Sequence, residues 1–301
     1  MVGALDMSVE GLSALPAPPR CEGFAWRELA HAPHGPFGAV SGSENLLHAN
    51  GFLANHSARG LPPLFTATSC CFSADLSFPT VWYDFDTSDE DFGALATAAA
   101  QTGWSSRREV AFFRGSIYWF EGHGRTRAFA RSLVAPSEID ADWYEELDTS
   151  ALETDGLPHF GDLSRHARHK YLLSLEGHSF WSFRLRQLSF LGSAVLHQAS
   201  PCHEFWHALL RPYEHYLPVA RDLADLRLLL RYARRHDAST ERMASRMRRL
   251  APKLLSRRAV LGYVQELLTQ YAALQTQRVS VHPKATPLGL GHALRDLTRE
   301  R

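Results

Sequence analysis

The sequence predicts an α/β protein in which the strands form a parallel sheet. From residue 109 onward, short apolar runs alternate with helical patterns, as expected where crossover helices join parallel strands. Two of these runs end at a glycine, in Arg114-Gly115-Ser116 and in Glu176-Gly177. Because glycine permits a tight turn, these positions indicate where a strand gives way to the next helix.

Each element of the sheet is predicted from its own pattern. Residues 110–113 form an apolar run typical of a buried strand, and residues 170–175 and 194–196 repeat this feature. Short strands are expected within residues 61–90, where aromatic and β-branched residues are frequent. Helices are expected at residues 90–102, 125–134 and 181–191.

The last hundred residues carry helical patterns. Asp222 is expected to cap one helix and Ser256 the final long helix, because their side-chain oxygens can accept from free amides of the first turn. The inward-facing residues expected are Leu223, Leu226, Leu230 and Ala233 in the first helix, and Val260, Val264, Leu267, Leu268 and Tyr271 in the second.

Length and composition indicate a globular protein of about two domains. The chain has 301 residues, of which 45% are hydrophobic, so a large core is possible. We expect a lobe over residues 1–108, a ligand-binding lobe over residues 109–280 and a tail over residues 281–301. Lys and Arg total 32, as do Asp and Glu, so net charge does not favour nucleic acid or an anionic membrane as the main partner.

Cysteine usage and the terminal segments give no sign of a secreted disulfide scaffold. Cys21, Cys70, Cys71 and Cys202 include no CxxC pair, which argues against a disulfide framework but is compatible with one bridge. Residues 1–20 lack the pattern of a signal peptide. Because no run of about 18 apolar residues occurs, we expect a soluble protein with no membrane span.

The turn at Arg114-Gly115-Ser116 is the first candidate site. Ligands of open α/β sheets bind beyond the carboxyl ends of strands, where glycine allows close approach and serine donates a hydrogen bond. Arg125 and Arg127 follow at the start of the next helix, whose N-terminus favours an anion. This pattern predicts a phosphate site, although an ordinary turn followed by surface arginines would give the same pattern.

A second candidate site follows the next strand. The strand ends at Gly177, and Ser182, Phe183 and Arg184 open the following helix. The planar guanidinium of arginine suits bidentate contact with a diphosphate. Arg184 could equally be a solvated helix residue, but two such loops after neighbouring strands favour a diphosphate site more strongly than either loop does alone.

A third motif suggests different chemistry. His203-Glu204-Phe205-Trp206-His207 matches HExxH, in which two histidines on one helix face bind zinc and the glutamate acts as general base. His215 comes twelve residues after His203 and lacks the preceding glycine of the longer metzincin pattern. Zinc-dependent hydrolysis is therefore a minor alternative.

Between residues 112 and 223 these motifs occur in a particular order. They are Phe112-Phe113-Arg114-Gly115-Ser116, Lys170-Tyr171-Leu172-Leu173, Gly177 with Ser182-Phe183-Arg184, Gly192-Ser193-Ala194-Val195-Leu196, Glu204-Phe205, and Tyr213-Glu214-His215-Tyr216-Leu217-Pro218-Val219 with Asp222-Leu223. Over residues 61–275 the chain resembles glycosyltransferase family 90, the group of protein O-glucosyltransferases and fungal capsule xylosyltransferases. The resemblance implies a GT-B architecture of two Rossmann-like lobes around a cleft, here with an abbreviated N-terminal lobe and a helical C-terminus.

The same resemblance implies roles for individual residues. Ser116, Arg125 and Arg184 fall where family members hold the nucleotide diphosphate, with Arg127 as a rival to Arg125, and Glu204 matches a glutamate near the donor. Asn50 falls at the position of the catalytic aspartate of the family. An amide cannot accept the proton of the acceptor hydroxyl, so the other candidate bases are His48, His56 and Asp75.

The function implied is inverting transfer of glucose or xylose from a UDP-sugar to a hydroxyl of a protein or glycan. The resemblance implies no metal and no cofactor beyond the donor, and no nucleic-acid partner. A catalytically weak pseudoenzyme that binds nucleotide sugar is the alternative suggested by Asn50. Family members act in the secretory lumen or in bacteria, and the residues do not choose between these compartments.

Overall fold

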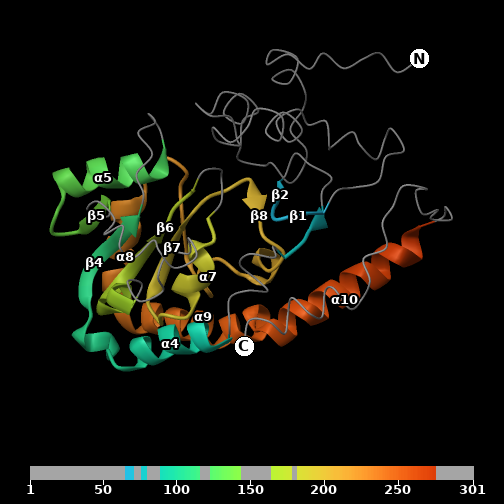
Figure 1. Cartoon of the computed structure of the whole chain (residues 1–301). Helices are drawn as coiled ribbons and strands as arrows, with labels where there is room; N and C mark the ends of the chain where they lie inside the picture. The colour runs from blue at the N-terminus through green and yellow to red at the C-terminus, as the bar shows by residue number, and fades with distance from the viewer. Residues whose placement is uncertain are drawn as a thin grey trace, which may run out of the picture. The chain divides into compact units, whose positions relative to one another are not determined.

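A five-stranded parallel sheet forms the centre of the protein (Figure 1). The computed structural model describes residues 65–70, 76–79, 89–115, 123–143, 164–177 and 182–275. All four pairings in this sheet are parallel, which confirms the predicted α/β class. In spatial order its strands are β5 (Ile139–Trp143), β4 (Arg108–Gly115), β6 (His169–Ser174), β7 (Ala194–Gln198) and β9 (Leu217–Val219).

Helices connect these strands and cover both faces of the sheet. The α-helices described are α4 (Asp89–Ala100), α5 (Gly124–Val134), α7 (Arg184–Ser189), α8 (Leu226–Arg235), α9 (Asp237–Leu255) and α10 (Arg257–Leu274). The 3₁₀ segments η5 (Trp104–Ser106), η7 (Ser164–Arg168) and η8 (His207–Leu209) lie between them. The helices expected at residues 90–102 and 125–134 are confirmed, whereas the one expected at residues 181–191 is shorter.

The described residues also form two small sheets of two strands each. β1 (Phe65–Thr66) pairs in parallel with β3 (Leu76–Ser77), which confirms short strands in this region. β2 (Ser69–Cys70) pairs antiparallel with β8 (Cys202–His203). The sequence also favours a strand in the run at residues 78–83, of which residues 78–79 are not in a strand and residues 80–83 lie outside the described residues, as does the greater part of the predicted N-terminal lobe.

Alternate residues along the three inner strands β4, β6 and β7 face two separate cores. Ala111 and Phe113 of β4 pack with Ala128 of α5 and with apolar residues of α8. Phe112 lies between them in sequence and packs on the other face with α4 and with Leu185 of α7. Helices α5 and α7 therefore lie on opposite faces, as right-handed crossovers running in opposite directions from β4 and β6 require.

The strand order reverses between β4 and β6. The chain passes from β4 to β5 on one side, and then crosses to β6, β7 and β9 on the other side. In open parallel sheets such a reversal leaves a crevice at the carboxyl ends of the two strands, because their following helices diverge to opposite faces. The fold therefore indicates a ligand position between the end of β4 and the end of β6.

Arg107 joins α4, β4 and the turn before β7. Its side chain is buried, and Nη1 donates to Leu191 O at 2.9 Å and to Ser193 Oγ at 2.6 Å, while Nη2 donates to Ala99 O at 3.0 Å. Burial lowers the pKa of the Arg107 guanidinium, as does the charge of nearby Arg248. The carbonyl and hydroxyl partners compensate this cost, so Arg107 stabilises the packing of α4 on the sheet.

Lys170 likewise joins several elements, at the amino ends of the strands. Its Nζ lies 2.8 Å from Glu109 Oε1 and 2.9 Å from Asp237 Oδ1, and Trp104 Nε1 donates to Asp237 at 3.0 Å. These contacts join β4, β6 and the first residue of α9. The start of α9 is thus fixed at the edge of the sheet opposite to the reversal crevice.

The predicted cap of the helix after residue 222 is wrong. Asp222 Oδ1 accepts from Ala224 N within a turn, and α8 begins only at Leu226. The reason is Leu223, whose φ of 60° is incompatible with a continuous right-handed helix. The apolar face was predicted correctly, since Leu223, Leu226, Leu230 and Ala233 are all buried.

The final helix agrees with its predicted start but not with its predicted face. Ser256 Oγ accepts from Ala259 N at 3.4 Å, as expected for a cap. Of the five residues expected to face inward, only Val260 is buried, and Leu268 is 44% exposed. The chain divides into compact units of residues 1–262 and 263–301, and α10 crosses that boundary.

Cys202 is disulfide-bonded. The cysteine pattern of the sequence was compatible with such a bridge. Cys202 lies in β8, and Ser200 Oγ accepts from its amide at 3.0 Å. Within the described part of the chain, no helix is long and apolar enough to cross a membrane.

One buried histidine, His169, and one half-buried histidine, His197, predict that the protein loses stability in weak acid. Burial lowers the pKa of His169 and of His197 from 6.5 to about 4, assisted by Arg108 and His203 respectively. As the pH falls from 6.5 towards 4, these histidines bind protons in the unfolded chain but not in the folded protein. The free energy of unfolding therefore decreases over this range. Each histidine should cost up to about 3 kcal/mol of unfolding free energy over this window.

Urea unfolding near neutral pH and near pH 5 measures this loss. The variant His169→Phe keeps a ring against Phe112, whose centre lies 3.9 Å from that of His169, and should lose less stability in acid. Substitution of exposed His236 by Gln serves as the control. Equal acid sensitivity of His169→Phe and the wild type would contradict the assignment.

Candidate functional site

Two arginines from different helices meet over one phenylalanine ring at the reversal crevice. Arg125 lies in the first turn of α5, which follows β4, and Arg184 is the first residue of α7, which follows β6. Their Cζ atoms lie 5.5 Å and 5.0 Å from the ring centre of Phe113. The face of this ring attracts cations, which helps hold two like charges close together.

Gly115 makes room for Arg184 at the end of β4. A Cβ on Gly115 would lie 2.9 Å from Arg184 Nη2 and 2.9 Å from Phe113 Cζ, so no other residue fits without displacement. Arg184 Nη1 donates to the carbonyl of Arg114 in the same place. Gly115, which the sequence places in a phosphate-binding turn, therefore leaves space that is occupied by the guanidinium group of Arg184.

Protein groups cap the N-terminus of α5. Glu176 Oε1 accepts from Gly124 N at 2.7 Å, and His123 Nδ1 accepts from Arg125 N at 3.2 Å. The helix terminus expected to attract a ligand anion already holds a carboxylate. The charge of a bound anion would be met by the arginine side chains rather than by these amides.

His123 is held in one neutral tautomer. Its Nδ1 accepts from the amide of Arg125, so Nε2 carries the hydrogen and donates to Gly177 O at 2.9 Å. Burial lowers the pKa of His123, and Arg125 and Arg221 add to this effect, while Glu176 opposes it. The cap therefore persists in its neutral form at physiological pH.

Glu176 also positions Arg125 through its main chain. Glu176 O accepts from Arg125 Nε at 2.8 Å, and Glu176 N donates to Gln198 Oε1 at 2.9 Å. The side-chain amide of Gln198 donates in turn to Arg221 O at 2.7 Å, and Arg221 Nη2 lies 3.7 Å from Glu176 Oε2. The sequence did not assign a site role to Glu176, His123, Gln198 or Arg221. Of these four, only Glu176 had a signal in the sequence, namely its place at the end of a predicted strand.

Two other predicted arginines do not join this pair. Arg114 points to the opposite face of the sheet, where its Nη2 lies 2.6 Å from Asp140 Oδ1. Arg127 is exposed, two residues further along α5 than Arg125. Of the two rivals for the diphosphate, Arg125 rather than Arg127 lies near the Phe113 ring that Arg184 also contacts.

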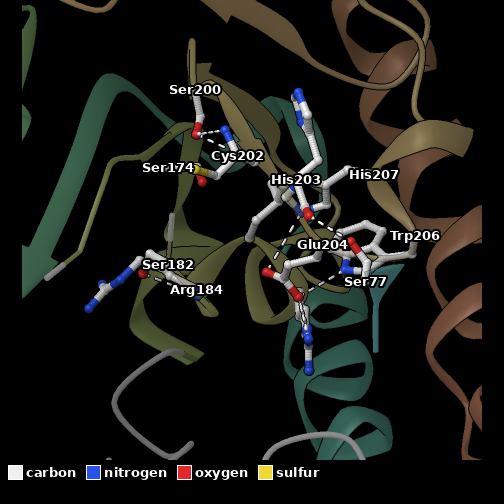
Figure 2. Close-up of polar contacts among 12 residues, drawn as sticks. Ser77, Ser174, Ser182, Arg184, Ser200, Cys202, His203, Glu204, Trp206 and His207 are labelled. Carbon is white, nitrogen blue, oxygen red and sulfur yellow. Dashed lines mark hydrogen bonds and ion pairs between the residues drawn. The ribbon is translucent and has the colours of Figure 1, made fainter. Parts of the chain in front are cut away.

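The segment before α7 contributes the remaining predicted residues. Ser182 Oγ accepts from Arg184 N at 3.4 Å, a contact shown in Figure 2. Phe183 lies under Arg186, with 4.9 Å between its ring centre and Arg186 Cζ. Gly177 is buried and accepts from His123, so it closes the site from the side of β6.

Glu204 is buried in an ion pair with α7. Arg186 contacts Glu204 Oε2 through Nε and Nη2, and Trp206 Nε1 donates to the same oxygen at 3.2 Å (Figure 2). The side chain of Glu204 is 0% exposed. Glu204 therefore fixes α7, the helix that begins with Arg184, while its carboxylate is directed into the protein.

The HExxH segment does not form the helix that a zinc site of this type needs. His203 lies in strand β8 and is exposed, whereas His207 opens the 3₁₀ segment η8. Glu204, the base in the zinc alternative, is paired with Arg186. Among the described residues no group of three His, Cys, Asp or Glu side chains is arranged to hold a metal ion.

The predicted catalytic region cannot be placed beside these groups. Asn50, His48, His56 and Asp75 lie outside the described residues, and so does Ser116. Their roles stay predictions.

The fold and the side chains described define a doubly wound α/β protein with two arginines over one phenylalanine ring at its strand reversal. Residues 51–293 match the family model described as Glycosyl transferase family 90. The chain belongs to this glycosyltransferase family, as the order of its motifs had predicted.

Several curated proteins are similar to this chain. Protein O-glucosyltransferase 1 of Rattus norvegicus is 30% identical over 206 residues, covering 67% of this chain and 51% of the relative. O-glucosyltransferase rumi of Drosophila pseudoobscura pseudoobscura is 31% identical, covering 62% and 46%. The chain thus spans about half the length of the curated relatives it matches.

Among solved structures, the chain is similar to Anabaena HepE in complex with UDP-glucose. The sequence identity is 13% and the TM-score is 0.46, with 79% of this chain and 71% of that chain covered.

The close fit of Gly124 against Gln198 predicts a defined cost for a single methyl group. A Cβ at Gly124 would lie 2.8 Å from Gln198 Cδ, so Gly124→Ala should destabilise the fold by about 1–3 kcal/mol, the usual cost of overpacking. Gly93→Ala is a matched control, because nothing lies within 4 Å of a Cβ in that helix. Urea unfolding measures the stability of both variants. Equal free energies of unfolding for Gly124→Ala and Gly93→Ala would contradict the close fit.

Proposed function

We propose that this chain transfers a sugar from a UDP-sugar to an acceptor hydroxyl, with Arg125 and Arg184 binding the diphosphate. The observation that carries the proposal is the convergence of both guanidinium groups over Phe113 at the reversal crevice. Membership of glycosyltransferase family 90 supports the reaction class. The names of the curated relatives, which are O-glucosyltransferases, favour glucose over xylose as the sugar.

The proposed reaction inverts the configuration of the sugar. The acceptor oxygen attacks the anomeric carbon, the bond from that carbon to the diphosphate oxygen breaks, and the hydroxyl proton passes to a base. Arg125 and Arg184 stabilise the negative charge that develops on the leaving diphosphate. Two fixed cations supply the charge that a divalent metal supplies in other transferases, so we propose a metal-independent reaction.

The acceptor and the base belong to the part of the proposal that rests on family resemblance. The donor lobe is assigned to residues 109–280, a range that includes the five strands of the central sheet except for Arg108, the first residue of β4. Residues 1–108 are assigned to the acceptor side, and the acceptor is a hydroxyl of a protein or glycan. A nucleotide-sugar-binding pseudoenzyme is the second candidate, favoured by Asn50 at the position of the family aspartate.

Arg184→Ala tests the donor site. Loss of a hydrogen bond to a charged group costs about 1.5–3 kcal/mol, so UDP affinity should fall by at least about tenfold. Calorimetric titration with UDP measures this change, and Arg127→Ala, at an exposed position of α5, should bind like the wild type. Unchanged UDP affinity in folded Arg184→Ala would refute the site.

Asn50→Asp tests the catalytic base. If the carboxylate restores proton abstraction, transfer should rise by about 10²–10⁴-fold while the affinity for UDP-sugar stays the same. Transfer assays and donor titration on the same protein separate these two effects. A wild type that transfers rapidly and is unaffected by Asn50→Asp would move the base to His48, His56 or Asp75.

A further inference from the structure

A run of positive charge begins in the first half of α9, at Arg242. Between residues 242 and 258, seven of seventeen residues are Lys or Arg and none is Asp or Glu. The whole chain, by contrast, has 32 basic and 32 acidic residues. The balanced total therefore conceals a local excess, which the proposed sugar transfer does not use.

Four of these cations form one stripe along α9. Arg242, Arg246, Arg249 and Lys253 follow one another at intervals of four, three and four residues, and all are exposed. At 100° per residue they fall within about 60° of the helix circumference and extend over about 17 Å. We call these four residues the basic stripe. The opposite face of the helix packs into the protein through Met243, Met247, Ala251 and Leu255.

The described residues do not neutralise the basic stripe. Among the described residues, no carboxylate lies within ion-pair distance of these four side chains, and Arg242 donates only to Ser239 Oγ, at 2.7 Å. Arg227 of α8 differs, because it pairs with Glu138 at 2.8 Å. Like charges four residues apart on a helix repel one another, so an external anion would relieve this cost.

The basic stripe lies away from the donor site. α9 begins at Asp237, which contacts Lys170 at the amino end of β6, whereas Arg125 and Arg184 lie beyond the carboxyl ends of the strands. An anion on the stripe is therefore not part of the donor or its leaving group.

We propose that the basic stripe of α9 docks the protein on a membrane surface that carries anionic phospholipids. One face of α9 presents these cations within about 60° of its circumference, which suits a layer of phosphate and carboxylate headgroups. Leu250 and Leu254 lie between the stripe and the buried face of α9, and both are half-buried and pack against the core. Residues 238–258 contain no aromatic side chain for base stacking, which makes single-stranded nucleic acid a poorer fit.

Vesicle co-sedimentation of the full chain tests the proposal. The wild type should bind vesicles containing phosphatidylserine, should not bind pure phosphatidylcholine, and should be released by added salt. The double variant Arg246→Gln/Arg249→Gln should lower the partition coefficient about 25-fold, since each basic residue near an anionic bilayer contributes about a five-fold factor.

A matched control separates the basic stripe from general positive charge. Arg231→Gln/Arg235→Gln removes two exposed arginines from α8 instead, and should change binding by no more than about two-fold. Retained UDP binding and circular dichroism in both double variants show that the fold is intact. The proposal is overturned by absence of binding to phosphatidylserine vesicles, by equal losses in the two double variants, or by binding of an acidic polysaccharide or RNA that these vesicles cannot displace.

Discussion

Glu176 joins four parts of the chain at the carboxyl edge of the sheet, and the geometry of the site depends on it. Its carboxylate caps α5, its carbonyl accepts from Arg125, and its amide donates to Gln198 at the end of β7. Arg221 approaches its second carboxylate oxygen. Because both the backbone and the side chain of one residue are fixed, the start of α5 cannot shift relative to β6 without breaking several hydrogen bonds together.

The arginines near the crevice fall into two groups that differ in the residues they contact. Arg114 pairs with Asp140 on the neighbouring strand, and Arg186 pairs with Glu204 inside the protein. These two stabilise strands and helices, whereas Arg125 and Arg184 are brought together over an aromatic ring. Arg125 and Arg184 thus bring two guanidinium groups to the place where the strand order reverses, the position at which an open α/β sheet binds ligands.

Much of the fold follows from local patterns in the sequence. The runs at residues 110–113, 170–175 and 194–196 all became parallel strands, because buried strands need continuous apolar segments. The strands at residues 139–143 and 217–219 were missed, since the first alternates with aspartates and the second is only three residues long. The cap at Asp222 failed for a local reason, the left-handed conformation of Leu223, which no propensity would favour for leucine.

By itself, the sequence determined the family, the α/β class and the turns that end β4 and β6, because these depend on short-range patterns and the order of motifs. Only the tertiary structure decided which charged side chains meet. Arg125 and Arg184 converge, Glu204 turns inward to Arg186, and Glu176 reaches the first amide of α5. These contacts join residues far apart in sequence, and strand order and helix packing set their distances, so no periodicity along the chain could reveal them.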